Sequence, residues 1–350
     1  MKVLTKELKD GKIVISSPLV SNIMLHGIGP KSEHIIKWNH SIGNQISESD
    51  MIRIARRVLR KADKSRKLER FLPKVLYTKD IDRRIMRFRV MLGSEYEEKR
   101  VLRFIIIEKL EPLYSIDDLG DFKSAVVDIF LGIHYLAISK ERIKHRDITI
   151  SSLMLRRTSR GKVQGVLSDW DSACNKEIEG EYNRDEIHVG TRAFISRELH
   201  IKKPLIHYER YDYESLLYSI YWIGVFYSEG KSRPGTEISE VYEDWKKWNS
   251  YEDDIITSKK GSFLYLGGKD GFLSSFFLPL DECWIDPIRD LFCDGYRAQI
   301  KYEKRKLNIG SLENRAEGKE ASSSSPQTVF NDETLGGHVT FEKIYNILCR

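Results

Sequence analysis

Three short motifs hold the residues of this 350-residue chain that could do chemistry. His145-Arg146-Asp147 comes first, an apolar stretch ending in Asp169-Trp170-Asp171 follows, and residues 190–198 (GTRAFISRE) come last. An aspartate on a loop can orient and deprotonate a hydroxyl, and a second aspartate at the end of a strand can hold the magnesium ion that neutralises phosphates. This order of motifs favours phosphoryl transfer, with Asp147 as the candidate base and Asp169 as the candidate metal ligand.

The elements that must position these aspartates are indicated by the hydrophobic pattern. Apolar residues recur at helical spacing over residues 119–136, which predicts a long amphipathic helix before Asp147. Residues 153–168 are typical of two short strands around a turn at Ser159-Arg160-Gly161, which would bring Asp147 and Asp169 back to one edge. The run from Tyr213 to Phe226 is apolar on every side, as expected of a helix enclosed by other elements.

The N-terminal third is basic and carries a second set of elements. Residues 51–100 hold 17 Lys or Arg against 7 Asp or Glu, a pattern typical of a solvated helix face and also able to bind phosphates. The Ser47-x-x-Asp50 pattern predicts the start of a helix through residue 62. Residues 85–92 and 101–110 are predicted to be paired strands.

Composition limits the class of protein. With 58 basic and 52 acidic residues the net charge is only +6, so general binding to nucleic acid is not indicated. The longest apolar-rich run, residues 215–228, is shorter than the roughly 20 residues of a membrane span, and the charged N-terminus does not resemble a signal peptide. Four separated cysteines predict free thiols. We expect an intracellular protein, cytoplasmic or nuclear, with no membrane partner.

With these motifs in this order, the chain resembles a eukaryotic protein kinase from about Pro18 to Ile300, and most closely the fungal-type protein kinase family. The resemblance implies an α+β, two-lobed protein-kinase-like fold with a small β-rich N-lobe and a larger helical C-lobe. We expect a reduced N-lobe over residues 1–110 and a C-lobe over residues 111–302. A flexible polar insert is expected over residues 303–337, because the stretch is Ser-rich and polar, and a C-terminal helix over residues 338–350.

The resemblance implies roles for the three motifs. Asp147 would be the catalytic base, Arg146 would contact the activation segment, and Thr191 would line the peptide-binding loop. Asp169 would be the magnesium ligand, and Ser152 would stand where the family has a metal-binding asparagine. Two further acids would be structural, with Glu198 closing the activation segment and Asp212 bracing the catalytic loop from below.

The resemblance extends to a nucleotide site in the smaller lobe. Lys37 would contact the α- and β-phosphates of ATP, and Glu48 would be its partner on the following helix. Backbone groups of Glu108 and Leu110, after the apolar stretch at residues 104–107, would meet the adenine edge. The implied cofactors are ATP and Mg²⁺, with Mn²⁺ as a possible substitute.

The chain departs from the family pattern at three places. The glycine-rich lid is reduced to Gly27-x-Gly29, so close to Lys37 that a whole strand is expected to be missing. Ser152 replaces an amide ligand by a hydroxyl, which can ligate a metal only weakly. Thr149 stands where many Ser/Thr kinases have a lysine that contacts the γ-phosphate.

These features leave several functions open. The favoured hypothesis is a protein kinase that transfers the ATP γ-phosphate to Ser or Thr hydroxyls of proteins. A pseudokinase scaffold is the first alternative, supported by Ser152 and the short lid. A small-molecule kinase of the aminoglycoside or choline type is the second, although such enzymes lack a stretch like residues 190–198. A nucleic-acid-binding module rests only on the basic stretch. The sequence does not indicate which protein is the substrate or what the oligomeric state is.

Overall fold

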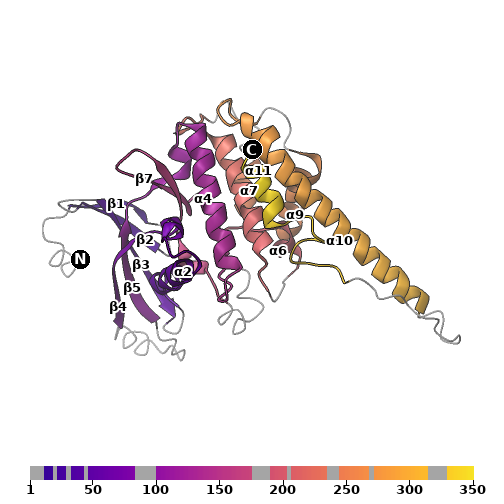
Figure 1. Cartoon of the computed structure of the whole chain (residues 1–350), viewed down its shortest axis with the longest axis horizontal. Helices are drawn as coiled ribbons and strands as arrows, with labels where there is room; N and C mark the ends of the chain where they lie inside the picture. Colours follow the sequence, from indigo (N-terminus) through magenta and orange to yellow (C-terminus); the bar gives the residue numbers. More distant parts are fainter. Residues whose placement is uncertain are drawn as a thin grey trace.

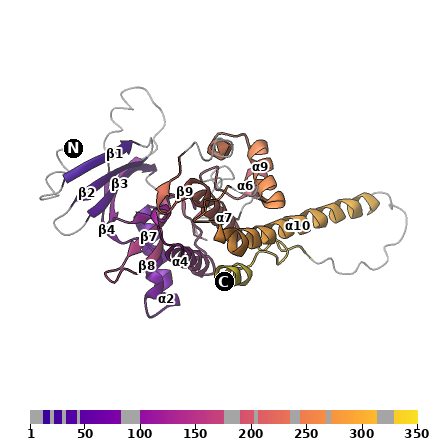
Figure 2. The ribbon, with the colours of Figure 1, turned by 90° about the horizontal axis from the view of Figure 1, so that it is seen from above.

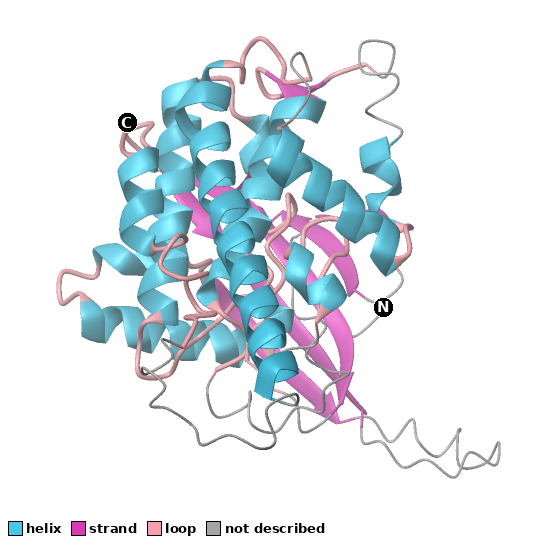
Figure 3. Cartoon of the chain, turned by 90° about the vertical axis from the view of Figure 1, so that its right-hand side faces the viewer, coloured by secondary structure: helices cyan, strands magenta, loops and turns pink. Residues whose placement is uncertain are grey.

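The computed structural model describes residues 12–18, 22–28, 33–42, 46–82, 100–175, 190–202, 206–234, 244–267, 272–313 and 329–350. These residues form a small lobe built on a β-sheet and a larger lobe made mainly of helices (Figure 1). Seen from the side of the larger lobe, its helices lie in front of the strands (Figure 3). The predicted α+β architecture with two lobes is confirmed.

The sheet of the small lobe has five antiparallel strands in the order β1-β2-β3-β5-β4. Their bounds are β1 Lys12–Pro18, β2 Asn22–Ile28, β3 Glu33–Ile42, β4 Val75–Asp82 and β5 Arg100–Glu108. In the pairing of β3 with β5, Lys37 lies opposite Ile105. Ile35, Ile105 and Ile107 are buried, as β-branched residues on the covered face of a sheet should be. The candidate phosphate-binding lysine therefore lies on a central strand.

Helix α2, Glu48–Ala62, connects the sheet to the larger lobe and begins where the sequence predicts. The Ser47 side chain accepts a hydrogen bond of 3.0 Å from the backbone N–H of Asp50, which caps the helix. Apolar residues at helical spacing are buried along one face: Met51, Ile52, Ala55, Val58 and Leu59. The cap and the buried face together make Glu48 the first helical residue and fix it on the side of the site.

The larger lobe packs its helices around α7, Glu209–Phe226, nearly all of whose residues are buried. The surrounding helices are α4 Leu119–Ala137, α6 Arg197–Ile201, α9 Asp253–Leu266, α10 Asp286–Glu313 and α11 Phe341–Leu348. The far end of α10 extends beyond the rest of the lobe (Figure 2). The enclosed helix predicted at residues 213–226 is confirmed.

A small sheet brings the candidate catalytic residues together. It contains β6 Glu111–Pro112, β7 Leu153–Arg157 and β8 Val163–Leu167, in that order, while β9 Tyr227–Ser228 and β10 Lys231–Ser232 pair separately. Strand β8 lies so close to α4 that a Cβ atom at Gly165 would lie 2.0 Å from the carbonyl oxygen of Ala125. Lys144 and Cys174 exchange backbone hydrogen bonds of 2.9 and 3.0 Å. This bridge joins the segment before Asp147 to the segment after Asp169.

The expectation of a missing strand in the small lobe is wrong. Two strands, β1 and β2, precede the strand that contains Lys37. Gly27 lies within β2, opposite Ile13 and His34, so the Gly27-x-Gly29 pattern does not lie between β1 and β2. The expectation rests on the glycines, whereas β1, with Ile13, Val14 and Ile15, contains no glycine. The strand predicted at residues 85–92 lies outside the described residues.

The expectation of a flexible insert over residues 303–337 is wrong at both ends of that range. Helix α10 continues to Glu313, and residues 329–337 form a turn-rich segment that packs on the lobe. The Leu335 side chain is fully buried, and Gly336 donates its N–H to the carbonyl of Asn331 at 2.8 Å. Average composition misses such a segment, because one buried leucine and local turns suffice to hold it. The predicted last helix is confirmed as α11.

Two smaller expectations concern membrane-spanning segments and the cysteine thiols. None of the helices in the described residues is long and apolar enough to cross a membrane. All four cysteines are free, as their spacing predicts.

Leu335 offers a direct test of the packed C-terminal segment. Leu335→Ala should lower the free energy of unfolding by about 2–5 kcal/mol, because it empties a fully buried site beside Gly295. Val329→Ala, in the same segment but 86% exposed, is the matched control and should change stability by less than about 0.5 kcal/mol. Urea denaturation measures both; equal small effects would mean that the segment is not packed.

Candidate active site

Lys37 is the centre of the candidate site. Its Nζ atom lies 2.9 Å from Oδ1 of Asp169 and 3.2 Å from Oε1 of Glu48. Burial lowers the pKa of Lys37, but the carboxylates of Glu48 and Asp169 outweigh that effect and hold the pKa above its ordinary value. The lysine is therefore charged, and it joins β3, α2 and the loop after β8.

Glu48 and Trp170 tie the helix of the small lobe to the loop of the larger one. The backbone N–H of Trp170 donates to Oε1 of Glu48 at 3.3 Å. The Trp170 ring is buried, donates its indole N–H to the carbonyl of Leu167 at 2.8 Å, and packs edge-on against His145. The Glu48 carboxylate is thus held by Lys37 from one side and by the Asp169 loop from the other.

Asp169 lies in the left-handed region of backbone conformation, with φ of 65°, two residues after the end of β8. Burial raises the pKa of Asp169, but the neighbouring Lys37 ammonium has the larger opposing effect, so the pKa lies below its ordinary range. Carboxylate oxygens of Glu48, Asp169 and Asp171 all lie within 4.8 Å of one another. Oxygen ligands of this kind suit Mg²⁺. Asp171, to which the motif order assigns no role of its own, belongs to this group.

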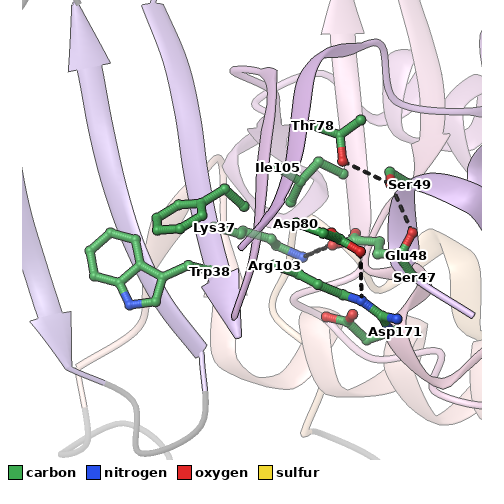
Figure 4. Close-up of a pocket in the computed structure, with 11 residues that line it drawn as sticks. Lys37, Trp38, Ser47, Glu48, Ser49, Thr78, Asp80, Arg103, Ile105 and Asp171 are labelled. Carbon is green, nitrogen blue, oxygen red and sulfur yellow. Dashed lines mark hydrogen bonds and ion pairs between the residues drawn. The ribbon is translucent and has the colours of Figure 1, made fainter. Parts of the chain in front are cut away.

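A pocket opens beside these groups between the sheet and the start of α2 (Figure 4). Its polar wall contains hydroxyls that bond one another, with Ser49 2.9 Å from Ser47 and 3.1 Å from Thr78. Arg103 reaches Asp80 at 3.4 Å, and Asp171 lies at the same opening. The pocket therefore places polar side chains of the sheet and of the start of α2 beside the Lys37 cluster.

Asp147 is oriented by Thr191, which lies in the stretch that leads to Glu198. Its Oδ1 atom accepts hydrogen bonds from the backbone N–H of Thr191 at 2.8 Å and from the Thr191 hydroxyl at 3.0 Å. Gly190 permits this approach, because its φ is +134° and a Cβ there would lie 2.8 Å from the carbonyl oxygen of Arg146. The structure thus brings two predicted site residues, Asp147 and Thr191, into direct contact.

Asp212 holds the catalytic loop from α7. Its two oxygens accept the backbone N–H groups of His145 at 3.0 Å and Arg146 at 3.1 Å, and Oδ1 also contacts Nε2 of His207 at 3.0 Å. Burial raises the pKa of Asp212, but His207 and these N–H groups outweigh it and keep the pKa below its usual range. The arrangement suits the bracing role expected from the sequence. Arg146 itself is buried, with φ of 71°.

Glu198 anchors the end of the activation segment. Its carboxylate pairs closely with Arg210 of α7 and accepts a bond of 3.1 Å from the Gln299 side chain of α10. Burial raises the pKa of Glu198, but Arg210 outweighs it and lowers the pKa below its ordinary value. Arg210 also donates to the carbonyl of Asp332 at 2.7 Å. The C-terminal segment therefore contacts this anchor, a link that no local pattern in the sequence indicates.

Ser152 lies buried within the catalytic loop. Its side chain has no exposed surface, and its hydroxyl contacts the carbonyls of Asp147 at 3.2 Å and Thr149 at 3.1 Å. The same oxygen accepts the backbone N–H of Thr149 at 2.9 Å. The hydroxyl is thus engaged by backbone groups of its own loop, and the weak metal ligation expected of Ser152 stays a prediction.

Glu108 has a structural role besides the contact with adenine that is expected of the backbone groups of Glu108 and Leu110, a contact that stays a prediction. The backbone N–H of Glu108 donates to the carbonyl of Lys74 at 3.0 Å, so that donor is not available to an adenine ring. The Glu108 carboxylate pairs with Arg156 of β7 and accepts the N–H of Lys74 at 2.7 Å. Leu110 is buried. Glu108 thus connects β5 to β7 of the three-stranded sheet through Arg156. Its position at the end of an apolar strand does not indicate this contact.

Removing the Asp212 carboxylate tests the bracing of the catalytic loop. Asp212→Ala should lower the free energy of unfolding by about 3–5 kcal/mol, because buried N–H groups of His145 and Arg146 lose their acceptor. Asp212 is stabilising above its unfolded pKa of about 3.9, and this contribution is lost as the pH falls through the lower folded pKa. Denaturation at several pH values should show the variant's deficit shrinking below about pH 4. A deficit that does not change with pH would contradict the assignment.

The sequence and the structure were compared with known proteins. The family model described as fungal protein kinase matches residues 26–224, which is more than half of the chain. Among solved structures, the kinase PK-1 of the Cydia pomonella granulovirus is similar over 63% of this chain and 73% of its own, with 11% identity and a TM-score of 0.39. No curated protein matches the sequence. The chain belongs to the fungal protein kinase family.

Proposed function

We propose that this chain transfers the γ-phosphate of ATP, with magnesium, to Ser or Thr hydroxyls of proteins. The observation that carries the proposal is the Lys37 cluster, in which one ammonium contacts Glu48 of the small lobe at 3.2 Å and Asp169 of the larger lobe at 2.9 Å. Membership of a protein kinase family supports the reaction type. Phosphoryl transfer depends mainly on positioning and charge neutralisation, and this cluster can supply both.

Asp147 is the proposed base. Thr191 holds Oδ1, and Oδ2 makes no hydrogen bond with any other described residue, so it can accept the proton of a substrate hydroxyl. Thr191 belongs to the stretch that would bind the acceptor peptide, so the same contact would align the peptide with the base. A base positioned in this way contributes about 10²–10⁴-fold to a rate.

The charged groups fit a metal–nucleotide complex. Magnesium bound to ATP neutralises the phosphate charges. Asp169, with 35% of its side chain exposed, would hold the metal, and Asp171 lies close enough to share it. Lys37 would exchange part of its contact with Asp169 for phosphate oxygens, while Glu48 keeps the ammonium in place.

A pseudokinase that binds partners without turnover is the second candidate, and the catalytic loop favours it. Ser152 is buried within the loop, and Thr149, which replaces a cationic residue of many Ser/Thr kinases, bonds Ser151 at 2.7 Å. At these two positions the loop therefore offers neither an amide ligand for the metal nor a cation for the γ-phosphate. The first hairpin, whose sequence from Lys12 to His26 contains no glycine, would also cover phosphates less closely.

A transfer assay tests the enzyme proposal. With labelled ATP, Mg²⁺ and generic protein substrates, Asp147→Asn should lower label transfer by about 10²–10⁴-fold, because the base is lost. Asp290→Asn, 69% exposed on α10, is the matched control and should transfer as the wild type does. Transfer that survives Asp147→Asn would reject Asp147 as the base.

Repair of the catalytic loop separates a weakened enzyme from a scaffold. Ser152→Asn should raise transfer by about tenfold, equivalent to about 1.4 kcal/mol, because an amide reaches further than a hydroxyl and can ligate the metal. Ser151→Asn, at the exposed neighbouring position, should give no gain. Urea denaturation must first show that the larger side chain is tolerated. No transfer with Mg²⁺ or Mn²⁺, together with an ATP-dependent thermal shift, would favour the pseudokinase.

A further inference from the structure

Lys260 of α9 is a buried ammonium outside the nucleotide site. The side chain has no exposed surface, and its Nζ atom donates to the carbonyls of Arg192 at 2.9 Å and of Ile195, and contacts Nε2 of His200 at 3.1 Å. Complete burial lowers the pKa of Lys260 well below its ordinary value, and the nearby Glu214 carboxylate opposes that effect. The three acceptors around Nζ match the three N–H donors of the ammonium form. The faces of Tyr218 and Trp248 lie 4.9 and 5.8 Å away and add cation–π attraction.

His200 extends this contact toward the surface. Its Nδ1 atom lies 3.1 Å from Oδ1 of Asp253, at the start of α9. Burial, together with the Lys260 charge, lowers the pKa of His200 to about 4, so the ring is neutral at physiological pH. A neutral ring that donates from Nδ1 to Asp253 has an acceptor lone pair at Nε2 for Lys260.

The contacts close into a ring around the loop at residues 191–195. Asp253 pairs with the Arg192 side chain at 2.9 Å, and Arg192 also donates to the carbonyl of Tyr251 at 2.6 Å. Lys260 holds the backbone of the same residue from inside. Within the loop, Phe194 donates its N–H to the carbonyl of Thr191 at 2.8 Å. The carbonyls that Lys260 binds, at residues 192 and 195, therefore lie on a turn that begins at Thr191.

We propose that Lys260 is a positioning residue: its ammonium fixes the turn at residues 191–195 so that Thr191 stays against Asp147 and the loop keeps the shape that receives an acceptor peptide. The inference rests on the proposed function for its catalytic consequence, but the loop contacts stand without it. A buried charge is costly unless it is fully hydrogen-bonded. Here two of the three acceptors are the backbone carbonyls of Arg192 and Ile195. The hydrogen bonds of Lys260 therefore hold the backbone of that loop in one conformation.

Two adjacent lysines allow a matched test. Lys260→Met removes the ammonium at nearly constant volume. Lys259→Met removes the neighbouring, 43% exposed lysine, which pairs with Asp244 at 2.8 Å. Hydrogen exchange of the amides at residues 191–195 should become at least about tenfold faster in Lys260→Met and stay unchanged in Lys259→Met, because the Thr191 N–H that bonds Asp147 loses its fixed position.

Transfer kinetics give the second readout. Lys260→Met should lower kcat/KM for a protein substrate by about 10–100-fold, while the thermal shift on adding ATP and Mg²⁺ stays as in the wild type, because the Lys37 cluster is untouched. Lys260→Arg, which keeps a charged donor, should recover part of the loss. A reduced kcat/KM without recovery by arginine would overturn the claim that the charge is what positions the loop.

The outcomes separate this inference from the proposed function. If the wild type transfers no phosphate but Lys260→Met still speeds exchange at residues 191–195, the kinase proposal fails and the positioning role stands. Unchanged exchange in Lys260→Met overturns the positioning role whatever the activity. If Lys260→Met does not fold, Asp253→Asn at the exposed end of the ring replaces it, and faster exchange at Arg192 is again the expected result.

Discussion

One buried ammonium group determines how the two lobes meet. Lys37 carries a charge that the surroundings do not solvate, so it must be balanced by carboxylates, and Glu48 and Asp169 supply that balance from different lobes. The position of α2 follows from this requirement, since Glu48 is its first residue. So does the conformation of the Asp169 loop, whose Trp170 N–H bonds the same glutamate. A fold that keeps these three groups together has already assembled the charges needed for phosphate and metal.

Buried, paired charges also hold the loops of the larger lobe. Glu198 is held by Arg210, Asp212 receives the N–H groups of the catalytic loop, and Lys260 binds loop carbonyls. Each is a charged side chain that is buried and paired mainly with neighbouring backbone or one opposite charge. Removing one partner of such an arrangement leaves an uncompensated charge, so the lobe depends on all three. The C-terminal segment adds to this set through the contact of Asp332 with Arg210.

The sequence predicted what depends on local periodicity and on motif order. The capped start of α2, the enclosed helix α7 and the β7–β8 hairpin each follow from spacing that repeats within the element. The errors have a different cause. Glycine is permissive in turns, so Gly27 predicts a lid, yet it lies within a strand. The position of Ser152 in a motif likewise does not say that its short hydroxyl contacts the carbonyl of Asp147. Lys260 was missed altogether, since its acceptors lie more than 60 residues away in sequence.

The central claim is that Lys37 and Asp169 form one energetic unit across the lobes. A double-mutant cycle with Lys37→Met, Asp169→Asn and the double variant, measured by chemical denaturation without nucleotide, tests it most directly. We predict a coupling free energy of about 1–3 kcal/mol, because each single variant removes one side of the 2.9 Å ion pair between these partly buried groups. Additive effects of the two changes, with no coupling beyond about 0.5 kcal/mol, would contradict the account.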